Sequence, residues 1–329
     1  MTDSPSAQAA SQGRSDDIIL PFRIENADVR GRLVRLGPAI DTILSAHDYP
    51  EEVAVLLGEA LSLAAVMAGT FKFEGRYTLQ TSGDGPILMM IADFSTSGAL
   101  RGYARYDDEA LAAASDKSAA VVPRLLGNGL LAFTVDQGAD MESYQGVVRL
   151  EGATLADCAH AYLRQSEQLG AAVRLQVART DTGWRAGAIM LEQLAGTPED
   201  GRSAEDVEDN WRRAVALLSS VQNDELLDAD LAGGSLLYRL FNEDGVRVFD
   251  ATDLEAKCRC SRERMVNVLA SFNPDELTDM IIDDKISSTC QFCNAEYVFT
   301  PAEIAVIAAQ STDDSNDNSN DDSNNDGAT

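Results

Sequence analysis

Four cysteines in the last third of the chain have the type and the spacing for metal or redox chemistry. They form two tight pairs, Cys258 with Cys260 and Cys290 with Cys293. Two such pairs joined by a long loop can hold one metal ion tetrahedrally through four thiolates. The same spacing allows each pair to close on itself as a disulfide. The sequence therefore predicts a zinc clamp or two local disulfides, and a site that can be both is a candidate redox switch.

The spacing leaves several kinds of site open. Most four-cysteine sites are structural and never change state, and four thiolates also serve an iron–sulfur cluster. A Cys-x-x-Cys pair is also found in thiol oxidoreductases, but those place it at the start of a helix, whereas Cys290 and Cys293 lie between two predicted strands. A disulfide between Cys258 and Cys260 would close a very small ring, and strained disulfides are the easily reduced, regulatory kind.

The elements that position the cysteines form a small predicted unit over residues 250–308. Ser261 is expected to cap one helix, and the run Asn-Pro-Asp-Glu at 273–276 to start a second. The second cysteine pair is expected in a knuckle between strands at 286–289 and 297–299. A unit of fewer than 60 residues has a poor surface-to-volume ratio, so a bound metal ion would supply much of its folding free energy.

Residues 196–249 are predicted to be a helical linker that is sensitive to the state of this unit. Apolar residues recur at helical spacing in its first half and cluster again in its second half. Such a stripe must dock on another surface, and it would be exposed if the small unit came apart. The candidate residues for linker docking or client binding are Trp211, Val215, Leu218, Leu236, Leu237, Leu240 and Phe241.

Residues 18–195 predict a mixed α+β core in which helices pack on β-sheets. A helix over 51–68 follows Pro50, and a second over 154–168 has Thr154 as its N-cap. Alternating or apolar runs predict strands at 76–80, 87–91, 100–106, 130–135 and 146–150. The expected fold class is therefore α+β: a core domain, a helical linker and a small four-cysteine zinc domain.

Composition narrows the functional classes. The net charge is −28, which opposes binding to phosphate backbones, so no nucleic-acid partner is expected. No signal peptide and no apolar run long enough to cross a bilayer is found, so we expect a cytoplasmic protein without a membrane partner. Residues 1–17 and the acidic tail 309–329 are expected to be disordered. Two histidines and no Ser-His-Asp pattern argue against an enzyme.

The motifs of the chain resemble those of a known family, the redox-regulated holdase chaperones of the bacterial thirty-three-kilodalton heat-shock family. The most specific motifs are the Cys-x-Cys pair followed by Ser-Arg-Glu-Arg at 261–264 and the run Cys-Gln-Phe-Cys-Asn at 290–294. Further similar segments lie at 29–31, 47–50, 80–86, 101–104, 144–146 and 165–168. The resemblance covers about residues 18–305, and the acidic tail departs from the family pattern.

The resemblance implies a mechanism as well as a fold. In the reduced protein one zinc ion would be bound by Cys258, Cys260, Cys290 and Cys293, and the protein would be inactive. Oxidation would form the disulfides Cys258–Cys260 and Cys290–Cys293, release zinc, unfold the linker and produce a homodimer. The exposed apolar surface would then hold unfolding client proteins without ATP. The alternative is a static zinc-ribbon adaptor or nucleic-acid-binding protein, which the net charge disfavours.

Overall fold

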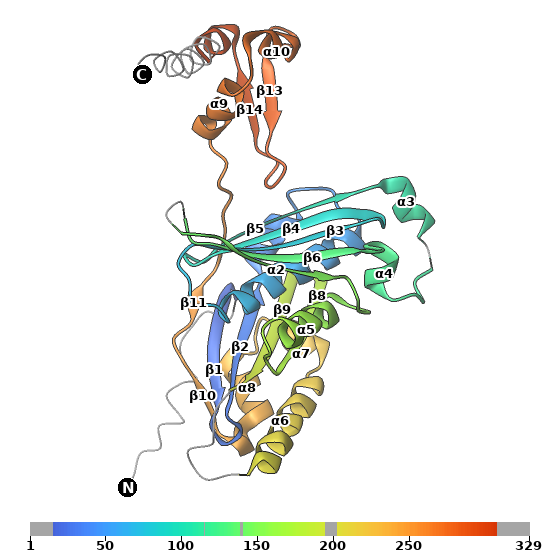
Figure 1. The fold of residues 1–329 in the computed structure, drawn as a ribbon, viewed down its shortest axis with the longest axis vertical. Helices are drawn as coiled ribbons and strands as arrows, with labels where there is room; N and C mark the ends of the chain where they lie inside the picture. The colour runs from blue at the N-terminus through green and yellow to red at the C-terminus, as the bar shows by residue number, and fades with distance from the viewer. Residues whose placement is uncertain (1–15, 115, 139–140, 195–202, 308–329) are drawn as a thin grey trace, which may run out of the picture. The chain divides into compact units, whose positions relative to one another are not determined.

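A computed structural model describes residues 16–114, 116–138, 141–194 and 203–307 (Figure 1). The chain divides into two compact units, the first ending at Lys257 and the second beginning at Cys258. The segments expected to be disordered lie outside the described residues, apart from Asp16 and Asp17, and so does the start of the predicted linker. The mixture of sheets and packed helices confirms the expected α+β class.

The first sheet of the first unit has the strand order β10-β1-β2-β9-β8, and all its pairs are antiparallel. Strand β11 also pairs with β1, at the end where Ile18 lies opposite Asp253. The strands are β1 (Ile18–Ile24), β2 (Val29–Leu36), β8 (Ala171–Thr180), β9 (Gly183–Gln193), β10 (Val246–Val248) and β11 (Thr252–Asp253). A short 3-10 turn, η3 (Glu25–Ala27), joins β1 to β2.

The second sheet has the order β12-β5-β4-β3-β6-β7. Only the pairing of β12 with β5 is parallel. The strands are β3 (Arg76–Gly83), β4 (Ile87–Ser95), β5 (Ala99–Tyr106), β6 (Gly129–Asp136), β7 (Tyr144–Arg149) and β12 (Glu255–Ala256). The five strands predicted in this region are confirmed, each extended or shifted by a few residues. Residues 252–253 and 255–256 thus pair with strands of the first unit, which ends at Lys257.

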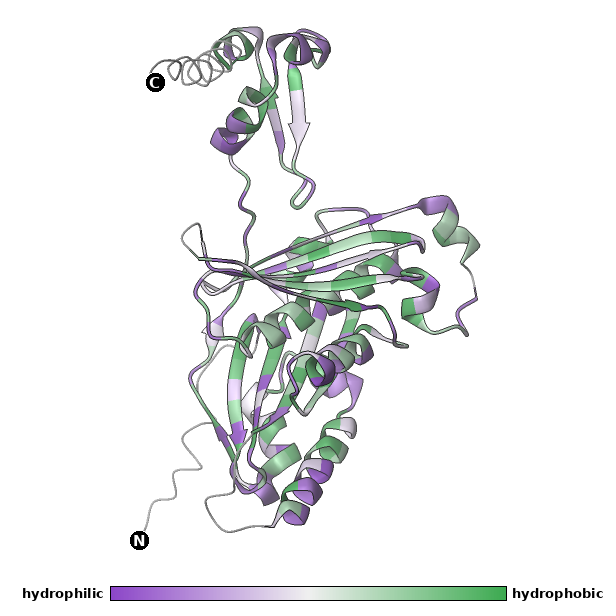
Figure 2. Ribbon diagram, in the orientation of Figure 1, coloured by the Kyte–Doolittle hydropathy of each residue, from purple (hydrophilic) through white to green (hydrophobic). Residues whose placement is uncertain are grey.

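Helix α2 (Glu51–Ala68) lies between the two sheets and packs on strands of both. Fourteen of its eighteen residues are buried, as expected of a helix that is apolar on all sides. Figure 2 shows this hydrophobic character over most of its length. Helix α5 (Leu155–Gln165) begins at the predicted Thr154 cap, where Thr154 and Asp157 form a capping box, and ends three residues before the predicted limit. The shorter helices are α1 (Pro38–Leu44), α3 (Asp108–Ala113) and α4 (Val121–Leu125).

Glu59 of α2 is a partly buried acid in this apolar environment, and desolvation raises the pKa of its carboxyl to about 7. The folded state therefore keeps a proton that the unfolded state loses near pH 4.5, so the free energy of unfolding falls as the pH rises from about 4.5 to 7. We expect Glu59→Gln to remove this fall and to raise the free energy of unfolding at pH 8 by about 1 kcal/mol. Denaturant titrations followed by tryptophan fluorescence at pH 5 and pH 8 would measure it.

Glu51→Gln is the matched control, because Glu51 lies in the exposed first turn of the same helix. The free energy of unfolding of the Glu51→Gln variant should keep the pH dependence of the natural protein. An equal pH dependence in the Glu59→Gln variant would show that another group causes it.

Three helices of the linker cover one face of the first sheet: α6 (Ala204–Ser219), α7 (Asn223–Leu227) and α8 (Gly233–Phe241), followed by η4 (Asn242–Asp244). Strand β9 is buried on both faces, and this explains why the linker helices dock on the first sheet. Its residues Ala188 and Met190 face the core around α2, whereas Ile189 and Leu191 face the linker. We call the second cluster the linker core; its buried members are Phe22, Ile24, Ala27, Val29, Leu33, Ile189, Leu191, Ala214, Leu218, Val221, Leu226, Leu236, Leu237 and Phe241.

The candidate linker residues occupy three different environments. Leu218, Leu236, Leu237 and Phe241 are buried members of the linker core, and Trp211 and Leu240 are partly buried against it. Val215 is half-buried, and Ala214 is the residue of that turn that enters the linker core. Ala214 therefore takes the buried place expected for Val215, whereas Trp211 and Leu218 of the predicted stripe do pack against the linker core. Figure 2 shows polar and apolar residues alternating along this helix.

The second unit has a small core of its own. It contains α9 (Arg262–Ala270), α10 (Pro274–Asp279), the hairpin of β13 (Ile286–Thr289) and β14 (Glu296–Phe299), and a last helical segment over 301–307. The predicted caps at Ser261 and Asn273 are confirmed by hydrogen bonds from the N–H groups of Arg264 and Glu276. The buried apolar residues are Leu269, Leu277, Ile286, Phe299, Ile304 and Ile307. None of the helices in the described part of the chain is long and apolar enough to span a membrane.

Candidate metal centre and linker contacts

The four paired cysteines of the second unit come together in space. Their sulfur atoms all lie within 4.8 Å of one another. The Sγ atoms of Cys258 and Cys290 are 3.7 Å apart, and those of Cys260 and Cys293 are 3.3 Å apart. A tetrahedral zinc ion with Zn–S bonds of about 2.3 Å separates its sulfurs by about 3.8 Å. The arrangement is therefore compatible with one zinc ion bound by four thiolates.

Local structure holds each pair in place. Cys258 and Cys260 directly precede the Ser261 cap of α9, so the start of this helix fixes the first pair. The second pair sits in the turn between β13 and β14. There the N–H of Cys290 donates to the carbonyl of Ala295, and the N–H of Asn294 donates back to the carbonyl of Cys290, both at 2.9 Å. Asn294 has a left-handed backbone (φ 58°), which asparagine tolerates well and which lets the knuckle close.

The thiols are partly buried and hydrogen-bonded to one another. Burial, followed by hydrogen bonds with the other thiols, raises the pKa of Cys293 to about 12. Tyr297 of β14 donates its hydroxyl to the sulfur of Cys260 at 3.1 Å, a contact that raises the pKa of Tyr297 to about 12. Metal binding must displace protons from such thiols, so affinity for a metal ion should rise with pH. All four cysteines were predicted as ligands from the sequence, but the contact between Tyr297 and the site was not predicted.

Other uses of the cysteines fit this geometry less well. An iron–sulfur cluster places several iron atoms between its ligands, which requires a wider separation of the sulfurs than one shared ion does. The fifth cysteine, Cys158, is buried in α5, and burial raises the pKa of its thiol to about 11. A buried thiol with a raised pKa is unreactive, so Cys158 has a packing role.

Two arginines of the first sheet donate hydrogen bonds to backbone carbonyls of the linker. Arg35 of β2 is fully buried and donates to the carbonyls of Asp228 and Leu231. Arg185 of β9 donates its Nε to the carbonyl of Leu227 at 2.6 Å. These carbonyls lie at or just after the end of α7, where a helix leaves its last carbonyls without internal partners. The arginines therefore cap α7 from the sheet and fix the linker in its docked position.

Sequence reasoning missed this pair of arginines. The available signal was their place in otherwise apolar strands, Val-Arg-Gly-Arg-Leu-Val-Arg-Leu in β2 and Gly-Trp-Arg-Ala-Gly-Ala-Ile-Met-Leu in β9. A charged residue at a strand position that faces a core requires a partner there. Which partner satisfies it depends on the linker, which lies about 190 residues further along the chain from Arg35.

The fold and the site together define a class of protein in which an α+β body with docked helices is followed by a small four-thiol unit. The chain belongs to the Hsp33 family, since the family model described as Hsp33 protein matches residues 17–300. A 33 kDa chaperonin of Caulobacter vibrioides is 47% identical over 299 residues, which cover 89% of this chain and 98% of that protein. A 33 kDa chaperonin of Pseudomonas fluorescens is 36% identical and covers 91% of this chain and 96% of its own length.

A solved structure shows the same fold. The crystal structure of the 33 kDa chaperonin of Thermotoga maritima, a heat shock protein 33 homologue, superposes with a TM-score of 0.75 at 23% identity. It covers 90% of this chain and 99% of that one. The relatives are named chaperonins rather than enzymes, which agrees with the expectation that the chain is not an enzyme. Membership in this family supports a chaperone function.

Proposed function

We propose that the chain is a redox-regulated, ATP-independent holdase that binds unfolding proteins under oxidative stress. The observation that carries this proposal is the cluster of four thiols, all within 4.8 Å, in a unit with only a small apolar core. A unit of this kind depends on its metal ion for its fold. Loss of the thiolates is then a direct way to unfold it.

Oxidation would act through the two sequence-adjacent pairs. Formation of Cys258–Cys260 and Cys290–Cys293 takes two electrons and two protons from each pair, and one peroxide per disulfide accepts them and becomes two water molecules. The disulfides remove the four thiolates, Cys258, Cys260, Cys290 and Cys293, that would hold one zinc ion per chain in the reduced state. The two sulfurs of each pair lie within 4.8 Å of each other, although the shortest contacts, Cys258 with Cys290 and Cys260 with Cys293, run between the pairs. Each disulfide therefore requires its two sulfurs to approach to about 2 Å as the metal site comes apart.

The linker would provide the client surface. We infer a division of roles among residues 18–195 as the core, 196–249 as the linker and 250–308 as the zinc switch. Undocking of the linker would expose apolar side chains on two surfaces, Leu236, Leu237 and Phe241 on the linker and Phe22, Leu33 and Ile189 on the sheet. Such surfaces bind unfolded clients and also favour a homodimer. The proposed location is the cytoplasm, where thiols are kept reduced.

One experiment tests the proposal by following three quantities during oxidation of the full chain. Reduced protein should contain about one zinc ion per chain and should not suppress the aggregation of an unfolding client. Peroxide treatment should release the zinc, lower the helicity and switch on the suppression together. Equal suppression by reduced and oxidised protein would contradict the switch, and zinc retained under peroxide would favour a static structural site.

A further inference from the structure

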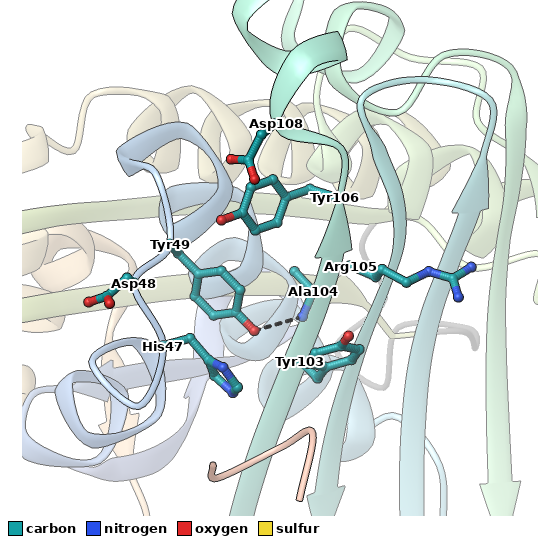
Figure 3. Close-up of a pocket in the computed structure, with 8 residues that line it drawn as sticks. All are labelled: His47, Asp48, Tyr49, Tyr103, Ala104, Arg105, Tyr106 and Asp108. Carbon is teal, nitrogen blue, oxygen red and sulfur yellow. Dashed lines mark hydrogen bonds between the residues drawn. The ribbon is translucent and has the colours of Figure 1, made fainter. Parts of the chain in front are cut away.

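A pocket of about 330 Å³ lies where the loop between α1 and α2 meets the end of β5 (Figure 3). Neither the metal centre nor the linker core includes it. Its walls combine aromatic rings with carboxylates, a combination that the packing of the core does not require. The residues that line it are His47, Asp48, Tyr49, Tyr103, Ala104, Arg105, Tyr106 and Asp108.

Aromatic rings form one side of this pocket. The ring centroids of His47 and Tyr49 are 5.0 Å apart, those of His47 and Tyr103 are 6.0 Å apart, and Tyr49 meets Tyr106 edge-on at 6.1 Å. Tyr49 is fixed because its hydroxyl accepts a hydrogen bond from the N–H of Ala104 at 3.1 Å, the dashed line in Figure 3. The group is therefore a preformed set of ring faces and edges around a hollow.

The charges at the pocket favour a cation. Asp108 lies against Tyr106, whereas the side chain of Arg105 points away from the rings (Figure 3). Burial, followed by the negative charges of Asp108 and Asp48, raises the pKa of Tyr106, which shows the sign of the local field. The net charge of the whole chain, −28, acts in the same direction over a longer range.

One ring nitrogen at the pocket is also left without a partner. His47 Nε2 is buried and has no hydrogen-bond partner within the described ranges. A neutral imidazole protonated at Nδ1 presents an acceptor at Nε2. A donor group brought into the pocket by a ligand would satisfy it.

We propose that this pocket binds the cationic side chain of an unfolded client segment, a lysine ammonium or an arginine guanidinium. The inference rests on the proposed holdase function and names a feature of the clients that it would select. Tyrosine faces attract such groups by cation–π interaction, and both groups donate hydrogen bonds to a carboxylate. A holdase with this pocket would prefer basic unfolded segments to neutral ones of equal hydrophobicity.

The test compares two peptides binding to oxidised full-length protein by fluorescence anisotropy. One is an apolar peptide with a single arginine, and the other carries citrulline, a neutral isostere, at that position. Asp108→Asn and Tyr106→Leu should each lower the affinity for the arginine peptide about fivefold and leave the affinity for the citrulline peptide unchanged. Glu109→Gln is the matched control, since Glu109 lies in the same turn of α3 and does not line the pocket. Equal losses for both peptides, or the same loss in the control, would overturn the proposal.

A second measurement separates the pocket from the holdase function. Acetyl-arginine methylamide is titrated into reduced protein and into its Asp108→Asn variant, with tyrosine NMR signals as the readout. Weak binding that is lost in the Asp108→Asn variant supports the assignment of the pocket to a cation. This holds even if the protein never suppresses client aggregation and the proposed holdase function is wrong. An absence of any binding overturns the proposal that the pocket binds a cation and does not affect the proposed holdase function. Binding of free spermidine more tightly than the arginine peptide would identify a small cation as the ligand and overturn the assignment to clients.

Discussion

Replacing Cys290 with serine is expected to unfold the second unit and to loosen the linker, while the two sheets and α2 of the first unit stay folded. A hydroxyl is a poor ligand for zinc, so the site would keep three thiolates and lose most of its affinity. Binding energies of structural zinc sites are about 10 kcal/mol or more, far above what the small core of this unit can supply. The core consists of six buried apolar side chains between two short helices, one hairpin and a last helical segment.

The expected result is visible in three measurements on reduced Cys290→Ser protein. The zinc content should fall from about one ion per chain to near zero. Hydrogen exchange should become fast throughout residues 258–307, while β3, β4 and α2 keep their protection. Limited proteolysis should cut between about residues 196 and 250 even in reductant. The reason is that β11 and β12, which tie the chain after the linker to β1 and β5, lead into Cys258 and would lose their ordered continuation.

Cys158→Ala is the matched control for the loss of a thiol. Cys158 is buried in α5, far from the other cysteines in sequence, so this variant should keep its full zinc content with at most a modest loss of stability. A Cys290→Ser protein with protected amides in α9 and α10 would show that the second unit folds without its metal. An unchanged digestion pattern in residues 196–250 would show that the linker docks independently of the second unit.

The parts of the molecule that were predictable from the sequence are those set by nearby residues. The cysteine pairs depend on spacings of two and three residues, and the caps at Thr154, Ser261 and Asn273 depend on side chains that reach three residues ahead. Helix α2 was predictable to the residue because Pro50 and two acids start it and its apolar run continues to Ala68. Local interactions dominate at each of these positions, so no distant contact overrides them.

The parts that were not predictable depend on contacts between distant residues. Which residues of α6 are buried depends on the sheet it packs against, because Ala214 and Leu218 share the linker core with Ile189 and Leu191 of β9, whereas Val215 is half-buried. The order of the strands places β12 beside β5, a pairing that joins residues about 155 apart. The tyrosine pocket likewise joins the loop before α2 to the end of β5, two segments about 55 residues apart in the sequence.

Replacing Arg35 with methionine is expected to release the linker without any oxidant. Arg35 is fully buried, and its two terminal nitrogens donate to the carbonyls of Asp228 and Leu231. Hydrogen bonds from a charged donor contribute about 1.5–3 kcal/mol each, and the variant would leave both carbonyls without a donor. Relief of the buried charge offsets part of this loss, because burial already lowers the pKa of Arg35. A net loss of about 3 kcal/mol would raise the undocked population roughly a hundredfold.

Hydrogen exchange over α6, α7 and α8 in reduced Arg35→Met protein measures the docking directly, and client aggregation measures its consequence. We expect faster exchange in the linker helices, unchanged zinc content and partial chaperone activity in reductant. Arg23→Met is the control, since Arg23 lies on the neighbouring strand β1 and, among the described residues, its side chain pairs with Asp28 at the surface. Surface pairs of that kind contribute less than about 1 kcal/mol, so this variant should behave as the natural protein.

A second variant acts on the docking of α7 from the neighbouring strand β9 and removes no charge. Gly187 of β9 faces α7, and a Cβ built there would lie 2.6 Å from Cγ of Leu226 and 2.8 Å from its carbonyl oxygen. Gly187→Ala should therefore push α7 from the sheet, although the strand itself accepts alanine. Exchange that stays slow in both variants would show that the sheet contacts of α7 do not hold the linker. Fast exchange without aggregation suppression would show that undocking alone does not create the client surface, and that the second unit must also unfold.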